Sequence, residues 1–197
     1  MTLYYRLGAN LYVNVTNRCQ CDCVFCVRGH TDSVGDAASL WLSHEPSYDE
    51  LTKAFDVRCD LDQVNEIVFC GFGEPLERAE IVVELAEHIK TKTQHRLRLN
   101  TNGLVRLICP AFDISRLAVF DAISVSLNAG TQEEYLRITR PGFGAQSFDA
   151  MLNFAVAMKQ HASVRFTAVE TLDIKQQEIC HQISSRLGIP LEIRSLI

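Results

Sequence analysis

The sequence predicts an α/β protein built on a mostly parallel sheet. Short apolar segments alternate with segments of helical periodicity six times along the chain, as in repeated strand–helix–strand units. One predicted strand, Glu66–Cys70, is almost entirely apolar, as is typical of strands that are covered on both faces. The chain has 197 residues, 47% of them hydrophobic and 22% charged, which is enough for one globular domain with a large core. We therefore expect a single domain over residues 1–197.

The first half of the chain predicts three strands and two helices. The turn residues Gly8-Ala9-Asn10 separate two short strands, since apolar residues alternate on either side of them. Ser47 and Glu50 have the spacing of a capping box, which predicts the start of a helix. The strands are expected over residues 3–7, 11–16 and 66–70, and the helices over residues 47–57 and 76–90.

The second half continues the alternation. Asn102-Gly103 is a turn signal that ends a strand, and Pro141-Gly142 ends a helix that begins at Thr131. Gly188 ends the last helix. The strands are expected over residues 96–101, 122–127, 164–169 and 190–194, and the helices over residues 114–118, 131–139, 147–160 and 173–187.

Four cysteines lie within eight residues directly after the second predicted strand. Cys19, Cys23 and Cys26 have the spacing C-x3-C-x2-C, and Cys21 lies inside the same loop. Three thiolates on a short loop can bind three irons of a [4Fe-4S] cube, whose usual complement is four cysteines. The fourth iron would then be open to a small molecule, and an open coordination position is typical of catalytic metal sites.

A structural zinc site and a disulfide are the alternatives for this loop. Zinc is also bound by sets of four cysteines, but usually through two separated ligand pairs, and no second pair follows. His30 and His44 have no paired partner in the sequence. Disulfides between cysteines this close would be strained, and the N-terminus has no signal peptide. Cys59, Cys70, Cys109 and Cys180 occur singly and are expected to be buried.

Polar residues cluster at the ends of the predicted strands. In barrels the working residues lie at the C-terminal ends of the strands, so these clusters are expected to meet at one rim. Apart from the cysteine loop, they are Gly71–Pro75, Asn100–Gly103, Ser124–Asn128 and Glu170-Thr171.

The cysteine loop, with Phe25 before its last cysteine, resembles that of the radical S-adenosylmethionine (SAM) superfamily. Residues 12–19 and 69–75 are most similar to the short TatD-associated members of that family. The resemblance implies a partial (β/α)6 TIM-like barrel with a short N-terminal strand or hairpin. It also implies a [4Fe-4S] cluster on Cys19, Cys23 and Cys26, and SAM as the second cofactor.

The resemblance also implies which residues contact SAM. Gly73-Glu74-Pro75 is similar to the family segment that approaches the SAM amino group, although Phe72 replaces its first glycine. Ser126 and Asn128 match positions that hydrogen-bond the ribose or carboxylate. Phe25 would flank the adenine and Arg140 would bind the carboxylate. The implied SAM contacts are Phe25, Gly73, Glu74, Asn102, Ser126, Asn128 and Arg140.

The activity implied by the resemblance is reductive cleavage of SAM to a 5′-deoxyadenosyl radical, which abstracts hydrogen from a substrate that the sequence does not identify. A 7-carboxy-7-deazaguanine synthase-like enzyme and a glycyl-radical-activase-like enzyme remain as alternatives. A non-enzymatic iron–sulfur or zinc module remains as an alternative from another class.

Composition limits the partners and the location. The net charge of −5 argues against a strong nucleic-acid footprint, and no apolar segment approaches the length of a membrane span. We expect a cytoplasmic protein, and the resemblance implies that it receives electrons from an external one-electron reductant. The long polar segment Arg28–Pro46, with the apolar pair Trp41-Leu42, is expected to be a lid or a docking loop for a macromolecular or partner-delivered substrate.

Overall fold

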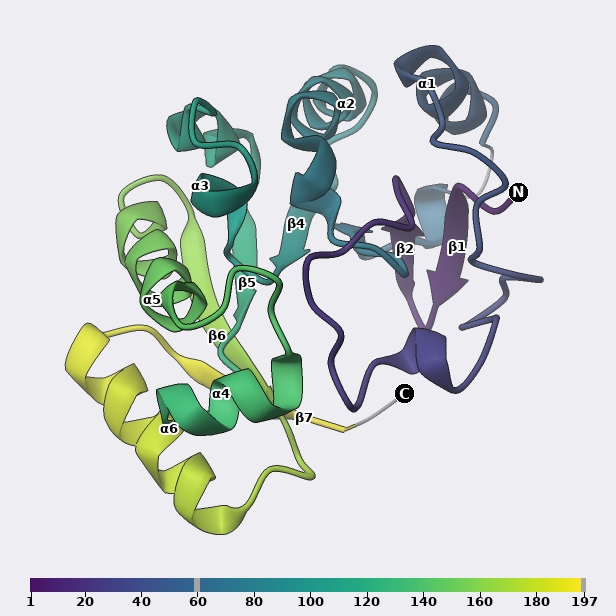
Figure 1. The fold of residues 1–197 in the computed structure, drawn as a ribbon. Coiled ribbons are helices and arrows are strands. Elements are labelled where there is room, and N and C mark those ends of the chain that lie inside the picture. Colours follow the sequence, from purple (N-terminus) through teal and green to yellow (C-terminus); the bar gives the residue numbers. More distant parts are fainter. Residues whose placement is uncertain (59–60, 196–197) are drawn as a thin grey trace.

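A single curved sheet of seven strands organises the molecule (Figure 1). The computed structural model describes residues 1–58 and 61–195. In this part of the chain the strands follow each other in sequence order across the sheet. They are β1 (Tyr4–Leu7), β2 (Asn10–Val13), β3 (Glu66–Phe69), β4 (Arg96–Thr101), β5 (Ala122–Ser126), β6 (Ser163–Val169) and β7 (Leu191–Arg194).

The direction of the strands confirms the predicted partial barrel. β1 and β2 form an antiparallel hairpin, and every later neighbour in the sheet is parallel, so β2 to β7 supply six parallel strands. β1 and β7 are the two ends of the strand order, and the sheet does not close on itself. The N-terminal hairpin is the short extra element that was expected.

Helices cover the outer side of the curved sheet (Figure 1). They are α1 (Tyr48–Asp56), α2 (Ala79–Lys92), α3 (Val105–Ile108), α4 (Gln132–Thr139), α5 (Gln146–Met158) and α6 (Ile174–Leu187). Short 3-10 helices cover Val27–Gly29, Leu61–Gln63, Pro75–Arg78 and Ile114–Val119.

Four local predictions need correction. The helix expected from residue 76 begins as a 3-10 turn at Pro75 and becomes α-helical at Ala79. The helix expected over residues 114–118 is a 3-10 helix, and the strand expected to reach Thr16 ends at Val13. The single turn α3 was not predicted, since four residues are too few for a helical period to show in the sequence.

The main core lies between the sheet and the helices. In β4 the alternation is clear: Leu97 and Leu99 are fully buried toward the helices, whereas Arg98 and Asn100 occupy the other face. Successive side chains of a strand point to opposite faces, so β4 and β7 send leucine and isoleucine side chains outward and charged or polar side chains into the barrel, whereas β3 places the apolar Val68 inside. This alternation gives the barrel a polar interior wall.

The capping box at the start of α1 is confirmed. The Glu50 backbone N–H donates to Ser47 Oγ at 3.2 Å, and the Ser47 backbone N–H donates to Glu50 Oε2 at 2.8 Å. Two backbone groups that the helix itself leaves unpaired are thus satisfied.

The segment 28–46 packs against the N-terminal hairpin. Val34, Leu40 and Leu42 are buried, and the first two form a small cluster with Tyr5 and Phe72. Trp41 is 41% exposed, although its ring packs edge-on against Phe72 with centroids 5.1 Å apart. The expected apolar pair is therefore split between a buried leucine and a partly exposed tryptophan.

Within residues 1–58 and 61–195, none of the helices has the length and apolar character that crossing a membrane requires.

Candidate active site

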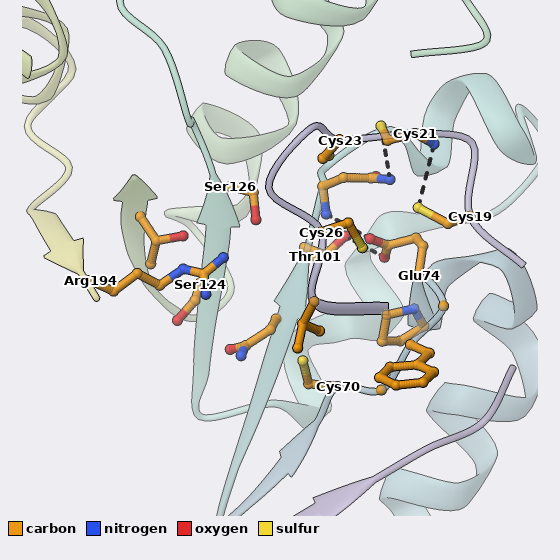
Figure 2. A pocket seen from close by; sticks show the side chains of 18 of the residues that line it. Cys19, Cys21, Cys23, Cys26, Cys70, Glu74, Thr101, Ser124, Ser126 and Arg194 are labelled. Atoms are coloured by element: carbon orange, nitrogen blue, oxygen red, sulfur yellow. Dashed lines mark hydrogen bonds between the residues drawn. The ribbon is translucent and has the colours of Figure 1, made fainter. Parts of the chain in front are cut away.

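A pocket of about 440 Å³ lies on the inner face of the sheet at the C-terminal ends of the strands (Figure 2). Its wall is built by the cysteine loop after β2, the Gly71–Pro75 segment after β3, and the ends of β4 to β7. Val34 and Leu40 of the segment 28–46 complete it. The strand-end clusters after β2 to β5 do therefore meet at one rim, as expected for a barrel. Glu170-Thr171, after β6, is not part of the lining.

The protein holds the cysteine loop in place through backbone contacts with the end of α4. The backbone N–H of Asp22 donates to Thr139 O at 3.0 Å, and that of Val24 donates to Ile138 O at 2.9 Å. The Gly142 N–H donates to Gln20 O at 2.7 Å. These bonds tie the cysteine loop to the end of α4 and to the residues that follow it.

Cys19, Cys23 and Cys26 all line the pocket. Hydrogen bonds from Cys21 lower the pKa of the Cys19 thiol to about 7, although burial acts in the opposite direction. Burial raises the pKa of Cys26. Because the thiolate is the form that binds metals, the lowered pKa favours metal binding by Cys19.

Cys21 is more deeply buried than its three neighbours, with 6% of its surface exposed. Its thiol forms hydrogen bonds with the thiols of Cys19 and Cys23, and these bonds, together with burial, raise its pKa. Asn102 Nδ2 donates to Cys21 Sγ at 3.8 Å, while the Cys21 N–H donates to Cys19 Sγ at 3.4 Å. Cys21 thus lies among the predicted ligands as a protonated thiol.

Gly71 and Gly73 allow the segment after β3 to approach the chain before the cysteine loop. A Cβ on Gly73 would lie 2.3 Å from the carbonyl oxygen of Thr16, and one on Gly71 would lie 2.1 Å from Asn14 Oδ1. The Gly73 and Glu74 N–H groups donate to the carbonyls of Thr16 and Arg18, at 3.0 and 2.8 Å. This backbone clamp ties the two segments together.

Phe72, at the position where the resemblance implies a glycine, is buried in the small cluster formed with the segment 28–46.

Glu74 is a buried carboxyl that connects the ends of β3 and β4. It accepts hydrogen bonds from Thr101 Oγ1 at 2.7 Å, from the Asn102 N–H at 2.7 Å and from the Leu76 N–H at 3.1 Å. Burial raises the pKa of Glu74 to about 7, and the nearby Cys19 adds to the shift, although these hydrogen bonds oppose it. Both carboxyl oxygens are occupied by protein donors, which indicates that Glu74 positions the rim.

Phe25, Asn102, Ser126 and Asn128 also line the pocket, together with Gly73 and Glu74. Asn128 is 4% exposed and adopts a left-handed backbone conformation with φ of 57°. Its Oδ1 is buried and has no hydrogen-bond partner among the described residues. A buried acceptor without a partner is costly, so Asn128 Oδ1 offers a contact that a ligand donor would satisfy.

Arg140 is the one predicted SAM contact that does not line the pocket. It ends α4 in a left-handed conformation with φ of 45°. Its guanidinium is exposed and lies 3.7 Å from the Asp22 carboxylate on the outer side of the cysteine loop.

Apart from Asn100, which belongs to a predicted strand-end cluster, the polar inner wall of the barrel was not predicted as part of the site. Its further residues line the pocket from β4, β6 and β7; they are Arg98, Thr167, Glu192 and Arg194. The period-two alternation of polar and apolar residues in these strands was the signal available in the sequence.

The isolated cysteines also differ from expectation. Cys180 is buried as expected, but Cys109 is exposed and the half-buried Cys70 lines the pocket. Cys59 lies outside the described residues.

The residues present fit the cofactors that such a loop implies. Three thiols from one loop border a pocket, and one of them has a lowered pKa. Among the described residues, no three metal-binding side chains converge as the ligands of a single ion would. A cube does not require this, because each thiolate binds a different iron. The unpartnered Oδ1 of Asn128 gives the same pocket a contact for an organic ligand.

These features define a class of proteins: parallel partial barrels that carry a three-cysteine loop at the ends of their strands. The family model of the radical SAM superfamily matches residues 13–183. The chain belongs to the radical SAM superfamily, whose enzymes use a [4Fe-4S] cluster and SAM.

The relatives are similar over a part of their length. A GTP 3′,8-cyclase of Rhodopseudomonas palustris is 32% identical over 137 residues, which are 67% of this chain and 36% of that protein. A GTP 3′,8-cyclase of Agrobacterium fabrum is 29% identical over 182 residues, or 86% of this chain and 46% of that protein. The chain thus spans less than half the length of these relatives.

A solved structure described as native anSMEcpe with bound AdoMet shares the fold. Its TM-score is 0.64 at 19% identity, and the match covers 94% of this chain and 51% of that one.

Proposed function

We propose that this chain is the catalytic core of a radical SAM enzyme, with Cys19, Cys23 and Cys26 as the ligands of its cluster. When bound, the cluster and SAM together supply a carbon radical that abstracts hydrogen from a substrate. The observation that carries the proposal is that the three thiols line the same pocket as the strand-end residues after β3, β4 and β5. A structural metal site would not need such a pocket beside it.

In this proposal the chain's own residues bind and orient SAM. Asn128 Oδ1 would accept a hydrogen bond from a ribose hydroxyl, since it is buried without a protein partner. Ser126 lies two residues earlier on the same rim, and Phe25 provides an aromatic wall beside the last cysteine. Asn102 donates through Nδ2 to Cys21 Sγ, so it connects the cysteine loop to β4.

Glu74 would act as a positioning residue in the proposed site. Its carboxyl binds Thr101, Asn102 and Leu76, so it sets the distance between the segment after β3 and the end of β4. The backbone of Gly73 then faces the pocket at a fixed place beside the cysteine loop.

A role for Arg140 would require its side chain to leave Asp22. Both side chains are exposed, at 59% and 78%, and such surface pairs contribute only about 0–1 kcal/mol. The contact with Asp22 is therefore no large barrier to a movement of Arg140 when SAM binds.

The proposed enzyme treats residues 1–197 as one radical SAM core and draws electrons from an external one-electron reductant. The seven described cysteines are free thiols, which suits the reducing cytoplasm. Its substrate could be macromolecular or delivered by a partner, because the sheet is open and Trp41 is partly exposed beside the pocket wall. Two substrate classes can be tested. The resemblance to TatD-associated members suggests a nucleic-acid-derived substrate, and the GTP 3′,8-cyclase relatives suggest a nucleotide such as GTP.

The test is anaerobic reconstitution with iron and sulfide, followed by an assay for 5′-deoxyadenosine in the presence of SAM and dithionite. We expect 5′-deoxyadenosine to form with the wild-type protein and to be lost with Cys23→Ala. The matched control is Cys109→Ala, because Cys109 is an exposed cysteine remote from the pocket lining. A reconstituted protein that binds iron but forms no 5′-deoxyadenosine would refute the enzymatic proposal.

A further inference from the structure

The pocket has two chemically different ends. Figure 2 shows Cys19 and Cys21 on one side, and Arg194 extending from its strand into the pocket on the other. The cysteine loop follows β2 near the start of the strand order, whereas Arg194 belongs to β7 at its end. A ligand held at Arg194 would therefore occupy a different part of the pocket from the cysteine loop.

Two of the arginines on the inner face of the sheet, Arg98 and Arg165, are neutralised by carboxylates. Arg98 Nε donates to Glu66 Oε2 at 2.7 Å, and both side chains are mostly buried. Arg165 Nη1 donates to Glu192 Oε2 at 2.8 Å, while Arg165 Nε donates to Ser124 Oγ at 3.0 Å. The guanidinium groups of Arg98 and Arg165 are therefore already bound to protein groups in the wall of the barrel.

Arg194 differs from them. It is half-buried and lines the pocket, yet its guanidinium has no ion pair or hydrogen bond within residues 1–58 and 61–195. Glu192 is paired with Arg165, and Glu170 Oε2 accepts a hydrogen bond from Ser195 Oγ. Cys70 is close enough to interact with Arg194 electrostatically, but it does not neutralise the charge because burial keeps its thiol protonated.

Within residues 1–58 and 61–195, the surroundings of Arg194 provide hydrogen-bond donors, and the nearby carboxylates are bound by other protein groups. Thr167 and Ser126 line the pocket as register partners on β6 and β5, and Glu192 is the register partner of Thr167 on β7. The carboxyl of Glu74 is bound by protein donors on the other wall. A guanidinium in a concave site with nearby hydroxyls matches the geometry of a carboxylate or a phosphate, which it can bind through two parallel hydrogen bonds.

We propose that Arg194 binds an oxyanion of the substrate, a carboxylate or a phosphate group, at the end of the pocket remote from the cysteine loop. The identification of the bound anion as part of the substrate rests on the proposed function. The binding of an anion by Arg194 does not. The proposal assigns the substrate class as anionic at this position and makes Arg194 a specificity-determining residue. Thr167, which lines the pocket from the neighbouring strand β6, offers a hydroxyl donor on that side.

Calorimetric titration of the reconstituted protein tests the anion site directly. The probes are inorganic pyrophosphate for a phosphoryl group and malonate for a carboxylate, and the one that binds identifies the group. The variants are Arg194→Gln, Arg194→Lys and the control Arg106→Gln, which removes an exposed arginine of α3 outside the pocket. Circular dichroism confirms that each variant is folded.

We expect Arg194→Gln to weaken binding of one probe by about tenfold or more, the usual size of a charged hydrogen-bond loss. The probe affinity of Arg194→Lys should lie between those of the wild type and Arg194→Gln, because lysine keeps the positive charge but cannot form the two parallel hydrogen bonds of a guanidinium. Arg106→Gln should bind like the wild type. If neither probe binds the wild type, or if both glutamine variants lose the same affinity, the inference is wrong.

A second titration, with SAM, separates this inference from the proposed function. If Arg194→Gln loses the anion but keeps SAM affinity and 5′-deoxyadenosine formation, Arg194 serves the substrate. If the variant loses SAM affinity to the same extent, Arg194 binds the SAM carboxylate, and the substrate assignment is overturned while the proposed function stands. If the wild type forms no 5′-deoxyadenosine, the proposed function fails, and the anion site is still judged by pyrophosphate and malonate.

Discussion

Replacement of Gly73 by alanine should break the backbone clamp between the cysteine loop and the segment after β3. The new Cβ would lie 2.3 Å from Thr16 O and 2.5 Å from Arg18 O. Both neighbours are backbone atoms, so neither can move aside as a flexible side chain would. Gly73 does not have a positive φ, and the predicted effect therefore comes from the clash alone.

The magnitude follows from the bonds that the clash would disrupt. The N–H groups of Gly73 and Glu74 each donate to this stretch of chain, at 3.0 and 2.8 Å. Each lost backbone bond costs roughly 0.5–1.5 kcal/mol, and forcing a methyl group into a packed site costs about 1–3 kcal/mol. We expect Gly73→Ala to lower the free energy of unfolding by about 2–6 kcal/mol.

Urea unfolding followed by circular dichroism, in anaerobic reducing buffer, measures this effect. The matched control is Gly29→Ala, in the 3-10 helix Val27–Gly29 after the cysteine loop, where an added Cβ meets nothing within 4 Å and φ is not positive. The control should stay within about 0.5 kcal/mol of the wild type. If the two variants unfold with equal free energies, and Gly73→Ala also reconstitutes with a normal iron content, the clamp does not exist as described.

Three further predictions concern a helix cap, a buried carboxyl and a left-handed asparagine. Ser47→Ala should lower the free energy of unfolding by about 1 kcal/mol, because it removes the capping box of α1; thermal unfolding checks this, and no loss would contradict it. The pKa of Glu74 is raised from 4.5 to about 7, so the folded state retains a proton that the unfolded chain releases between these pH values. The unfolding free energy should therefore fall as pH rises through this window, and Glu74→Gln should flatten the slope seen in urea unfolding; an equal slope would contradict the shift. Asn128→Gly should keep stability but weaken SAM binding in calorimetry, whereas Asn128→Ala should also lose about 1–2 kcal/mol of stability, since φ is 57°; unchanged SAM affinity in both variants would exclude the ligand role.

Local patterns were sufficient to predict the order of the elements. The capping box, the apolar strand before Cys70 and the Asn102-Gly103 turn each involve residues close together in the sequence. The cysteine loop is also a local pattern, because the spacing of three nearby cysteines was enough to predict a cluster-binding loop. Neighbouring strands in the sheet are also neighbours in the chain, so the strand order required no long-range information.

The contacts that depend on distant residues could not be predicted in this way. Phe72 is buried because the segment 28–46 folds back over the hairpin, and no local pattern encodes that packing. Arg140 lies outside the pocket lining because α4 ends in a left-handed residue beside Asp22. Arg194 lines the pocket because β7 pairs in parallel with β6, which places it on the inner face. That Arg194 has no carboxylate partner in the described part of the chain depends on where the fold places the surrounding charges, which no local pattern encodes.

The central claim is that Cys19, Cys23 and Cys26 bind the cluster and that Cys21, although it lies among them, does not. The most direct measurement is the iron and acid-labile sulfide bound per chain after anaerobic reconstitution of the four single alanine variants. The account predicts a large loss for Cys19→Ala, Cys23→Ala and Cys26→Ala, and a content close to wild type for Cys21→Ala. A wild-type iron content in Cys23→Ala, or its loss in Cys21→Ala, would contradict it.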